Sequence, residues 1–339
     1  MTTQHSTTTT ANYEAVRQRA GALSRVDLGR LVVSGRDRAS YLQGLLSNDI
    51  AALGAGRGCY AVYLTAQGRM ITDLHVYELG DVILLTLPLE VKDSVLTKLD
   101  QFIFSEDVQL GDVTSTLGSR TVIGPDAAAL VSRALLGVEF ATLAALPEHG
   151  SVRGQFKDQP VIVLRVTDTG EPGFDLLIDS SETTALGAAL RTAGAVDVEP
   201  ELVDAMRVEA GVPKFHRDMD EDTIPLEAGI ESRAISQTKG CYVGQEVIIR
   251  VLHRGHGRVA KRLVGLVLEG DRVPAAGTPA LVDGRDVGRV TSAVLSPGLL
   301  RPIALAYLHR DFTEPGVRVA IDGSSAVVTA TPFVRASGV

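Results

Sequence analysis

Hydrophobic positions in the first third of the chain follow two different spacings. Apolar side chains at helical intervals predict one helix over residues 34–50 and another over residues 90–104. Between them, residues 59–88 alternate in the manner of strands, and turn residues interrupt the alternation at 67–68 and at 80–81. This region therefore predicts a meander of three strands flanked by helices.

A second cycle of strands and helices begins near Gly118. The spacing predicts a helix over residues 126–137, a hairpin over residues 160–179 and a helix over residues 181–194. A further helix is expected over residues 200–211, because a glycine and a proline punctuate its end.

The pattern of apolar and turn residues changes after Lys261. Short β-rich runs recur at roughly even spacing and are separated by Gly, Pro and Asp-Gly turns. Such a pattern is typical of a small antiparallel barrel or sandwich. Together with the two mixed regions before it, the pattern predicts an α+β protein that ends in a β domain.

Length and composition narrow the class of protein. A chain of 339 residues is long for one hydrophobic core, so two or three domains are expected. Apolar residues make up 45% and charged residues 22%, which is the composition of a folded globular protein. A formal charge of −8 argues against nonspecific nucleic-acid binding. Since no apolar run approaches the ~18 residues needed to cross a bilayer, we expect neither a nucleic-acid nor a membrane partner.

The start of the chain and the cysteines indicate a compartment. The polar segment MTTQHSTTTT lacks the apolar core of a signal peptide, and we expect a disordered tail over residues 1–23. Cys59 and Cys241 lie far apart in the sequence and do not form a disulfide framework. These features predict a cytoplasmic protein.

The segment KGCYVGQE, residues 239–246, concentrates residue types that chemistry uses. Lys239 precedes Cys241, and a nearby cation lowers the pKa of a thiol and favours its reactive thiolate. Two glycines permit close approaches, while Gln245 and Glu246 add a hydrogen-bond donor and a carboxylate. The alternative is that Cys241 is a small buried hydrophobe in a glycine-rich turn.

A basic stretch follows this segment. Residues 239–262 contain six lysines and arginines and one acidic residue, inside an otherwise acidic protein. Arg250 and Arg254 are candidates for holding an anionic ligand, and the alternative is a solvated basic linker. His253 and His256 have no third ligand in view, so we expect no metal site.

Two acidic residues are further candidates. Glu209, in RVEAG, could accept paired hydrogen bonds from a guanidinium or a pterin; the alternative is an ion pair with Arg207 or another surface basic group. Asp73 lies in the middle of the strand-like GRMITDL, where burying a carboxylate without partners is costly. Asp73 is therefore either outward-facing or functional.

With these residues assembled, the sequence closely resembles the YgfZ-like family, relatives of the glycine-cleavage T-protein (GcvT, aminomethyltransferase). KGCYVGQE matches that family's signature K-G-C-[FY]-x-G-Q-E at all eight positions. The resemblance covers about residues 25–335 and includes, in order, the blocks LQGLLSNDI, QGRMITDL, RVEAGVPKF, IPLEAGI and GQEVIIRVLHRG. It implies two mixed α/β domains and a small C-terminal antiparallel β-barrel, arranged as a ring around a central cavity.

The resemblance also implies how the chain is divided after its N-terminal tail. A folate-binding α+β domain is expected from residues 24–115 together with residues 200–255. A second α+β domain is expected over residues 116–199, and the barrel domain over residues 256–339.

The same resemblance implies roles for individual residues. Glu209 is expected to bind the pterin ring of a folate, with Arg207 beside it, and Cys241 is expected to be a reactive thiol. Asp73 falls where the aminomethyltransferases have an Asp-Asp-Leu that serves folate-dependent transfer. Here the pair reads Thr72-Asp73, so one carboxylate is missing and the methylamine-transfer step is in doubt. The remaining residues expected around the thiol and the folate are Lys239, Gln245, Glu246, Arg250 and Arg254.

The function implied is support for the assembly or repair of iron–sulfur clusters in client proteins, through Cys241 and a bound tetrahydrofolate or derivative. A transient cluster would need further ligands from outside the chain, because clusters take about four. Two alternatives stay open. One is a folate-dependent aminomethyltransferase-type enzyme, and the other is a folate sensor without chemistry.

Overall fold

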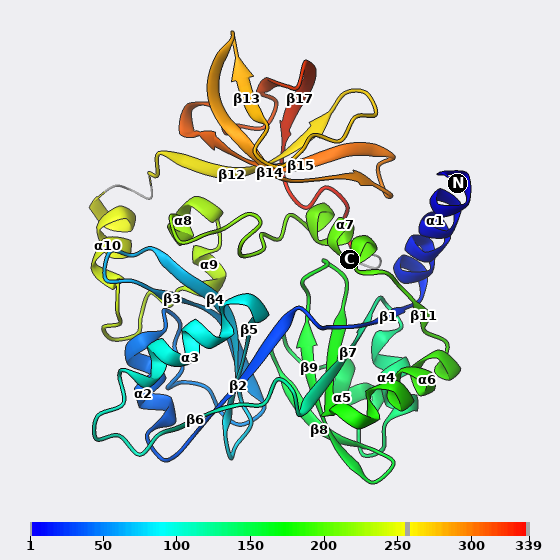
Figure 1. Cartoon of the computed structure of the whole chain (residues 1–339), viewed down its shortest axis with the longest axis vertical. Helices are drawn as coiled ribbons and strands as arrows, with labels where there is room; N and C mark the ends of the chain where they lie inside the picture. Colours follow the sequence, from blue (N-terminus) through cyan, green and yellow to red (C-terminus); the bar gives the residue numbers. More distant parts are fainter. Residues whose placement is uncertain (1, 255–257, 337–339) are drawn as a thin grey trace.

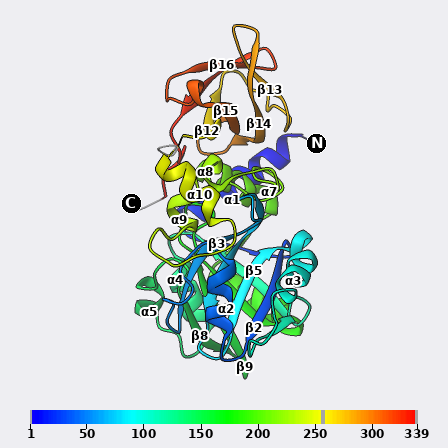
Figure 2. The same cartoon turned by 90° about the vertical axis from the view of Figure 1, so that its left-hand side faces the viewer.

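Three bodies make up the protein. The computed structural model describes residues 2–254 and 258–336, with the side chains of residues 10–252 and 258–336. Two α/β domains lie side by side, and a β-barrel lies above them (Figure 1). The side view shows the same stacking, with helix α7 (Pro200–Ala210) in the layer between the barrel and the two domains (Figure 2). The predicted α+β fold with a C-terminal antiparallel barrel is confirmed.

The first domain is built on a five-stranded antiparallel sheet in the order β3-β4-β5-β2-β6. The predicted meander is present as β3, β4 and β5, with Gly68 and Gly80 at positive φ in its two turns. Glycine adopts that conformation without the strain that a Cβ causes. The elements are β2 (Leu28–Ser34), α2 (Arg38–Leu45), β3 (Arg57–Leu64), β4 (Met70–Glu78), β5 (Ile83–Pro88), α3 (Lys92–Asp100) and β6 (Gln109–Asp112).

A later part of the chain returns to this domain. Phe215, Ile230 and Ile248 are buried in the same hydrophobic cluster as Leu42 and Tyr63. Two segments that are distant in sequence therefore share one core. The returning segment contains the short helices α8 (Pro225–Ala228), α9 (Glu231–Ala234) and α10 (Gln245–Ile249), followed by the π-helical turn Arg250–Arg254.

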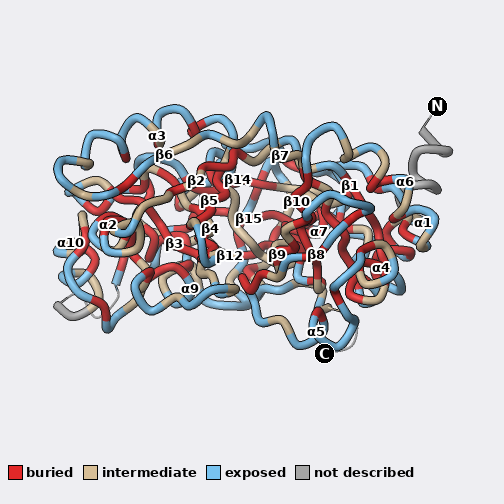
Figure 3. Tube along the Cα trace, turned by 90° about the horizontal axis from the view of Figure 1, so that it is seen from below, coloured by how far each residue is buried: buried red, intermediate tan, exposed pale blue. Residues whose placement is uncertain are grey.

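The second domain is built on a six-stranded sheet in the order β11-β1-β7-β10-β9-β8. Its helices bury one apolar face against the sheet, with Leu130, Leu186 and Leu190 in the core. The elements are β1 (Gly21–Ser24), β7 (Leu117–Ile123), α4 (Ala127–Ala134), α5 (Phe140–Ala144), β8 (Ser151–Phe156), β9 (Gln159–Val166), β10 (Gly173–Asp179), α6 (Thr183–Ala193) and β11 (Val196–Asp197). From below, buried segments follow the strands of both domains and exposed segments form the periphery (Figure 3).

The barrel closes in the order β12-β15-β14-β13-β16-β17, with antiparallel pairing throughout. Strand β15 is buried on both faces, because Ile303 and Leu305 pack against Val208 of α7 while Ala304 and Ala306 face the barrel core. The strands are β12 (Lys261–Leu268), β13 (Pro279–Val282), β14 (Arg285–Ser296), β15 (Arg301–His309), β16 (Arg318–Ile321) and β17 (Ser324–Thr329).

The start of the chain differs from the disordered tail expected over residues 1–23. Helix α1 runs from Thr2 to Gln18 and leads directly into β1. Tyr13 and Val16 are buried in a cluster with Met206 of α7. The composition of the tail did not reveal this helix, because its order depends on contacts with residues about 190 positions away.

The Glu209 network joins α1, α7 and the barrel. The Glu209 carboxylate is fully buried and accepts hydrogen bonds from Tyr13 Oη at 2.8 Å and from Arg17 Nη2 at 2.6 Å. Its other oxygen accepts from the Ser296 hydroxyl and from the Gly298 backbone N–H at 2.9 Å. Burial and the neighbouring Glu209 charge raise the pKa of Tyr13, which keeps its hydroxyl protonated as a donor. Four donors thus compensate one buried charge.

Truncating Glu209 should destabilise the protein rather than change a ligand contact. Glu209→Ala removes one of the two buried carboxylates that pair with Arg17, leaving Glu171 at 2.7 Å, and also leaves the Tyr13 and Ser296 hydroxyls without their acceptor. Breaking a buried pair costs about 3–5 kcal/mol. Glu246→Ala is the matched control, because Glu246 pairs with Arg250 on the surface and should change stability by less than about 1 kcal/mol. Denaturant unfolding of both variants measures the difference. Equal losses would contradict a structural role for Glu209.

Candidate active site

A cavity of about 250 Å³ lies between the two α/β domains. Its walls come from β4, the link 23–28, the segment 166–173, the loop 212–215 and helix α9. The apolar part of the lining includes Val26, Leu28, Leu87, Phe215 and Ile230. The polar part includes Arg25, Asp27, Tyr60, Asp73, His75 and Asp168.

Asp73 presents its carboxylate to this cavity because of strand alternation. Successive residues of β4 point to opposite faces, and Asp73 lines the cavity while Thr72 is fully buried on the other face. The Tyr60 hydroxyl donates a hydrogen bond of 2.7 Å to Asp73 Oδ2. Burial raises the pKa of Asp73, although the hydrogen bond from Tyr60 and the nearby His75 oppose the shift. The cavity therefore holds an oriented carboxylate whose proton affinity is increased.

His75 follows Asp73 on the same face of β4 and also lines the cavity. Its ring lies 5.1 Å from the ring of Tyr60 and 4.9 Å from that of His149, measured between centroids. His149 belongs to the second domain, so the two imidazoles meet across the domain boundary. Burial and the facing His75 lower the pKa of His149 to about 3, which keeps His149 neutral.

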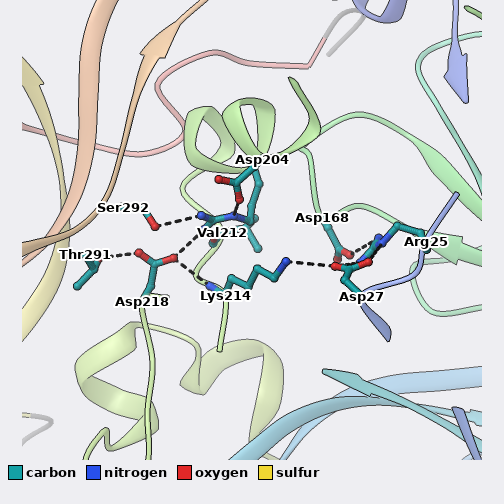
Figure 4. Close-up of polar contacts among 10 residues, drawn as sticks. Arg25, Asp27, Asp168, Asp204, Val212, Lys214, Asp218, Thr291 and Ser292 are labelled. Atoms are coloured by element: carbon teal, nitrogen blue, oxygen red, sulfur yellow. Dashed lines mark hydrogen bonds and ion pairs between the residues drawn. The ribbon is translucent and has the colours of Figure 1, made fainter. Parts of the chain in front are cut away.

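A chain of charged groups crosses one side of the cavity (Figure 4). Arg25 pairs with Asp27 at 2.8 Å and lies 3.8 Å from Asp168 of the second domain. Lys214 Nζ reaches Asp27 at 3.1 Å. Although burial alone would raise the pKa of Asp27, Arg25 and Lys214 hold it well below its usual range. Asp27 is therefore ionised and connects the link 23–28 to the loop after α7.

The same chain of contacts continues into the barrel through Arg207. Its guanidinium bonds Asp204 at 2.8 Å, Asp218 at 2.7 Å and the hydroxyl of Ser292 at 3.1 Å. Thr291 of the barrel donates to the other oxygen of Asp218 (Figure 4). Arg207 borders the cavity, as the sequence predicted for a binding residue, but these partners occupy its donors.

Both parts of this architecture match known protein families. Residues 2–239 match the GCVT N-terminal domain, and residues 261–335 match the glycine cleavage T-protein C-terminal barrel domain. The aminomethyltransferase of Nostoc sp. (strain PCC 7120) is 32% identical and covers 97% of this chain and 88% of its own. The aminomethyltransferase of Streptomyces avermitilis is also 32% identical, with coverages of 95% and 88%.

The chain belongs to the glycine cleavage T-protein family. A solved structure has the same fold. The crystal structure of glycine cleavage system aminomethyltransferase T from Bartonella henselae superposes with a TM-score of 0.87, at 22% identity, covering 97% of this chain and 90% of that chain.

This membership corrects the function expected from the sequence. Support for iron–sulfur clusters through Cys241 is wrong as the main interpretation, because relatives at 32% identity over nearly the whole chain are named aminomethyltransferases. The relatives favour the transferase alternative instead.

No group of three or more His, Cys, Asp or Glu within the described residues is arranged to hold a metal ion. None of the described helices has the length and hydropathy needed to cross a bilayer.

Several residues predicted for the site lie elsewhere in the T-protein fold. Glu209 is not among the residues that line the cavity, and its oxygens are occupied by the Glu209 network. None of the described residues from 236 to 252 lines the cavity either. Cys241 is exposed on the segment that packs against α2, so the structure does not bring it together with Asp73.

Lys239 donates hydrogen bonds at the C-terminal end of α2. Its Nζ donates to the carbonyl oxygens of Gln43, Leu46 and Asn48, at 2.7, 2.6 and 2.9 Å. The Gln43 carbonyl lies in the last turn of α2 and the other two follow the helix, where backbone acceptors lack partners within the helix. Burial lowers the pKa of Lys239 to about 8, opposed by the charge of Asp49.

The remaining predicted residues make local contacts. Gln245 donates to the Gly240 carbonyl at 3.4 Å, and Glu246 pairs with Arg250 at 2.6 Å on the exposed side of α10. The side chain of Arg254 lies outside the described residues, as do those of His253 and His256.

The sequence interpretation also missed residues that the cavity brings together. Tyr60, His75, Arg25, Asp27 and Asp168 come from both α/β domains and from the link between them. Only His75 carried a local signal, since it lies two positions after Asp73 on one strand and must share its face.

The two glycines of KGCYVGQE should respond differently to alanine. Gly244 has φ +84°, and an added Cβ would lie 2.5 Å from the carbonyl oxygen of Thr65. Gly244→Ala should destabilise the protein by about 1–3 kcal/mol through strain and displacement of the β3–β4 turn. Gly240→Ala is the control, because nothing lies within 4 Å of its Cβ and its φ is not positive. Unfolding midpoints measure both, and similar values would contradict a packing role for this segment.

Proposed function

We propose that the protein is a tetrahydrofolate-dependent aminomethyltransferase whose reaction takes place in the cavity between the two α/β domains. The observation that carries the proposal is the Asp73 carboxylate, which lines the cavity, accepts a hydrogen bond from Tyr60 and has a raised pKa. When N–H bonds of the folate are replaced by N–C bonds, protons must leave its nitrogens, and a positioned carboxylate can accept them. The names of the relatives support the same activity.

The cavity suits the heterocyclic head of a folate. Its volume of about 250 Å³ is near the lower end of small-molecule sites, which run from roughly 300 to 1,000 Å³. Val26, Leu87 and Phe215 offer apolar surface to a flat ring, and Asp73 offers a carboxylate oxygen to a ring N–H. The longer remainder of a folate would extend from the cavity toward solvent.

The Thr72-Asp73 pair does not count against transfer chemistry. The side chain of Thr72 is buried on the face of β4 away from the cavity, where its hydroxyl donates to the Asp73 carbonyl at 2.9 Å. A carboxylate at position 72 would lie on that same inward face. The carboxylate that the cavity requires is Asp73, which is present.

Within the family, we infer from the eight-residue match to the signature that the chain belongs with the YgfZ-like members. The contacts of Lys239 and Gly244 give this segment a role in packing α2 and the β3–β4 turn against α10.

Asp73→Asn should remove transfer activity while keeping the fold. The assay mixes tetrahydrofolate with an aminomethyl thioether and measures methylene-tetrahydrofolate and ammonia. Loss of a positioned acid–base group typically costs about 10²–10⁴-fold in rate, and Asp100→Asn on the exposed end of α3 should cost nothing. If the wild type forms no methylene-tetrahydrofolate, or if Asp73→Asn keeps full activity, this function is wrong.

Although Asp73→Asn should lose activity, it should be as stable as the wild type or more stable. Because the pKa of Asp73 is raised in the folded protein, the folded state holds this proton more tightly than the unfolded chain. The ionised carboxylate therefore weakens the fold at neutral pH. Asp73→Asn should unfold at the same or a higher temperature than the wild type at pH 7, and this difference should disappear below the unfolded pKa of about 4. A lower melting temperature at pH 7 would contradict the raised pKa.

A further inference from the structure

The transfer reaction moves two protons, and Asp73 is one acid–base group. Moving the one-carbon unit from an aminomethyl thioether to N5 and N10 of tetrahydrofolate forms two C–N bonds and breaks one C–S and one C–N bond. The two N–H protons of the folate leave, one ends on ammonia and the other on the thiol, and no electrons are gained or lost. A second group that exchanges protons would let both transfers proceed inside the cavity.

Resting on the function proposed above, we propose that His75 is the second proton-transfer residue of the cavity and works beside Asp73 on the reacting nitrogens and leaving groups. The two side chains share one face of β4, because they are two positions apart, and this spacing places them about 7 Å from each other along the strand. Both line the same cavity. Thr72 is fully buried and does not line the cavity, whereas Leu74 is buried in the core of the first domain and also borders the cavity.

Strand pairing fixes the position of both groups. His75 lies directly across from Tyr60 in the β3–β4 register, while Val62 lies across from Asp73. The Tyr60 hydroxyl therefore reaches diagonally to Asp73 while the Tyr60 ring contacts His75. On the other side of β4, the register partner of His75 is Thr86 of β5, which carries no charge.

The ring nitrogens of His75 are available for chemistry. No hydrogen bond from either nitrogen to another described residue is present, and His75 is only half-buried. Imidazole is the side chain whose ordinary titration lies nearest neutral pH, so it can both accept and return a proton under working conditions. A histidine kept for packing alone would be expected to have its nitrogens bonded.

Charged and titratable groups surround His75 on several sides. The facing acidic groups are Asp73 and Asp168. Burial raises the pKa of Asp73 and His75 opposes that rise, whereas His75 and Arg25 together lower the pKa of Asp168 against the effect of burial. His149, which packs against the ring from the second domain, stays neutral because burial lowers its pKa to about 3. Charges farther along the cavity wall come from Arg233, which pairs with Glu148 at 3.2 Å, and from Arg25, which pairs with Asp27.

The test compares three substitutions in the full-length protein. His75→Phe keeps an aromatic ring in the stack but cannot carry a proton, His75→Gln keeps polarity, and His75→Ala leaves space for added imidazole. We expect kcat to fall about 100-fold in each, KM for tetrahydrofolate to change less than threefold, and one inflection to vanish from the pH profile of kcat. Added imidazole should restore part of the activity of His75→Ala. His309→Gln, on the barrel, is the control and should match the wild type.

The outcomes separate this inference from the proposed function. The role of His75 would be overturned, and the proposed function kept, by one pair of results. The wild type would form methylene-tetrahydrofolate, and a folded His75→Phe or His75→Gln would keep kcat and both inflections of the pH profile. A wild type without transfer activity would overturn the proposed function itself. Loss of activity without imidazole rescue and with an unchanged pH profile would identify His75 as a packing residue, which also contradicts the proposal.

Discussion

Two buried guanidinium groups hold three bodies around one cavity. Arg17 of α1 pairs with Glu209 of α7, which also bonds the barrel. Arg207 of α7 bonds Asp218 and the barrel strand β14. Each charge is taken out of water, so each fixes its partners tightly once the fold has formed. Each domain has a core of its own, and a smaller apolar cluster, in which Tyr77 and Leu84 meet Leu164 and Leu177, also joins the two α/β domains beside the cavity.

The cavity in turn determines what its carboxylates do. Asp27 and Asp73 both line it, yet the pKa of one is lowered and that of the other raised. The difference follows from partners, because Asp27 lies beside Arg25 and Lys214 whereas Asp73 has only a neutral hydroxyl and a nearby histidine. The first is held as an anion between two cations, and the second has an increased affinity for a proton. Residue type alone does not separate these two roles.

The segment KGCYVGQE makes packing contacts with two neighbouring elements. In KGCYVGQE, Lys239 donates to three carbonyls in the last turn of α2 and just after it, and Gly244 leaves room for the β3–β4 turn. A segment with such dense local constraints is easy to recognise in a sequence. The residues that surround the cavity are spread over both α/β domains and have no shared motif.

The sequence by itself determined the strand meander and the C-terminal barrel, and it singled out Asp73 as a candidate site residue. Each of these depends on spacing within one strand, helix or turn, which local residue patterns record. Only the tertiary structure decided that residues 2–18 form a helix, that Glu209 belongs to an interdomain network, and that His75 meets His149 at the cavity. Those outcomes depend on partners more than 70 positions away, and a pattern of neighbouring residues carries no information about such partners.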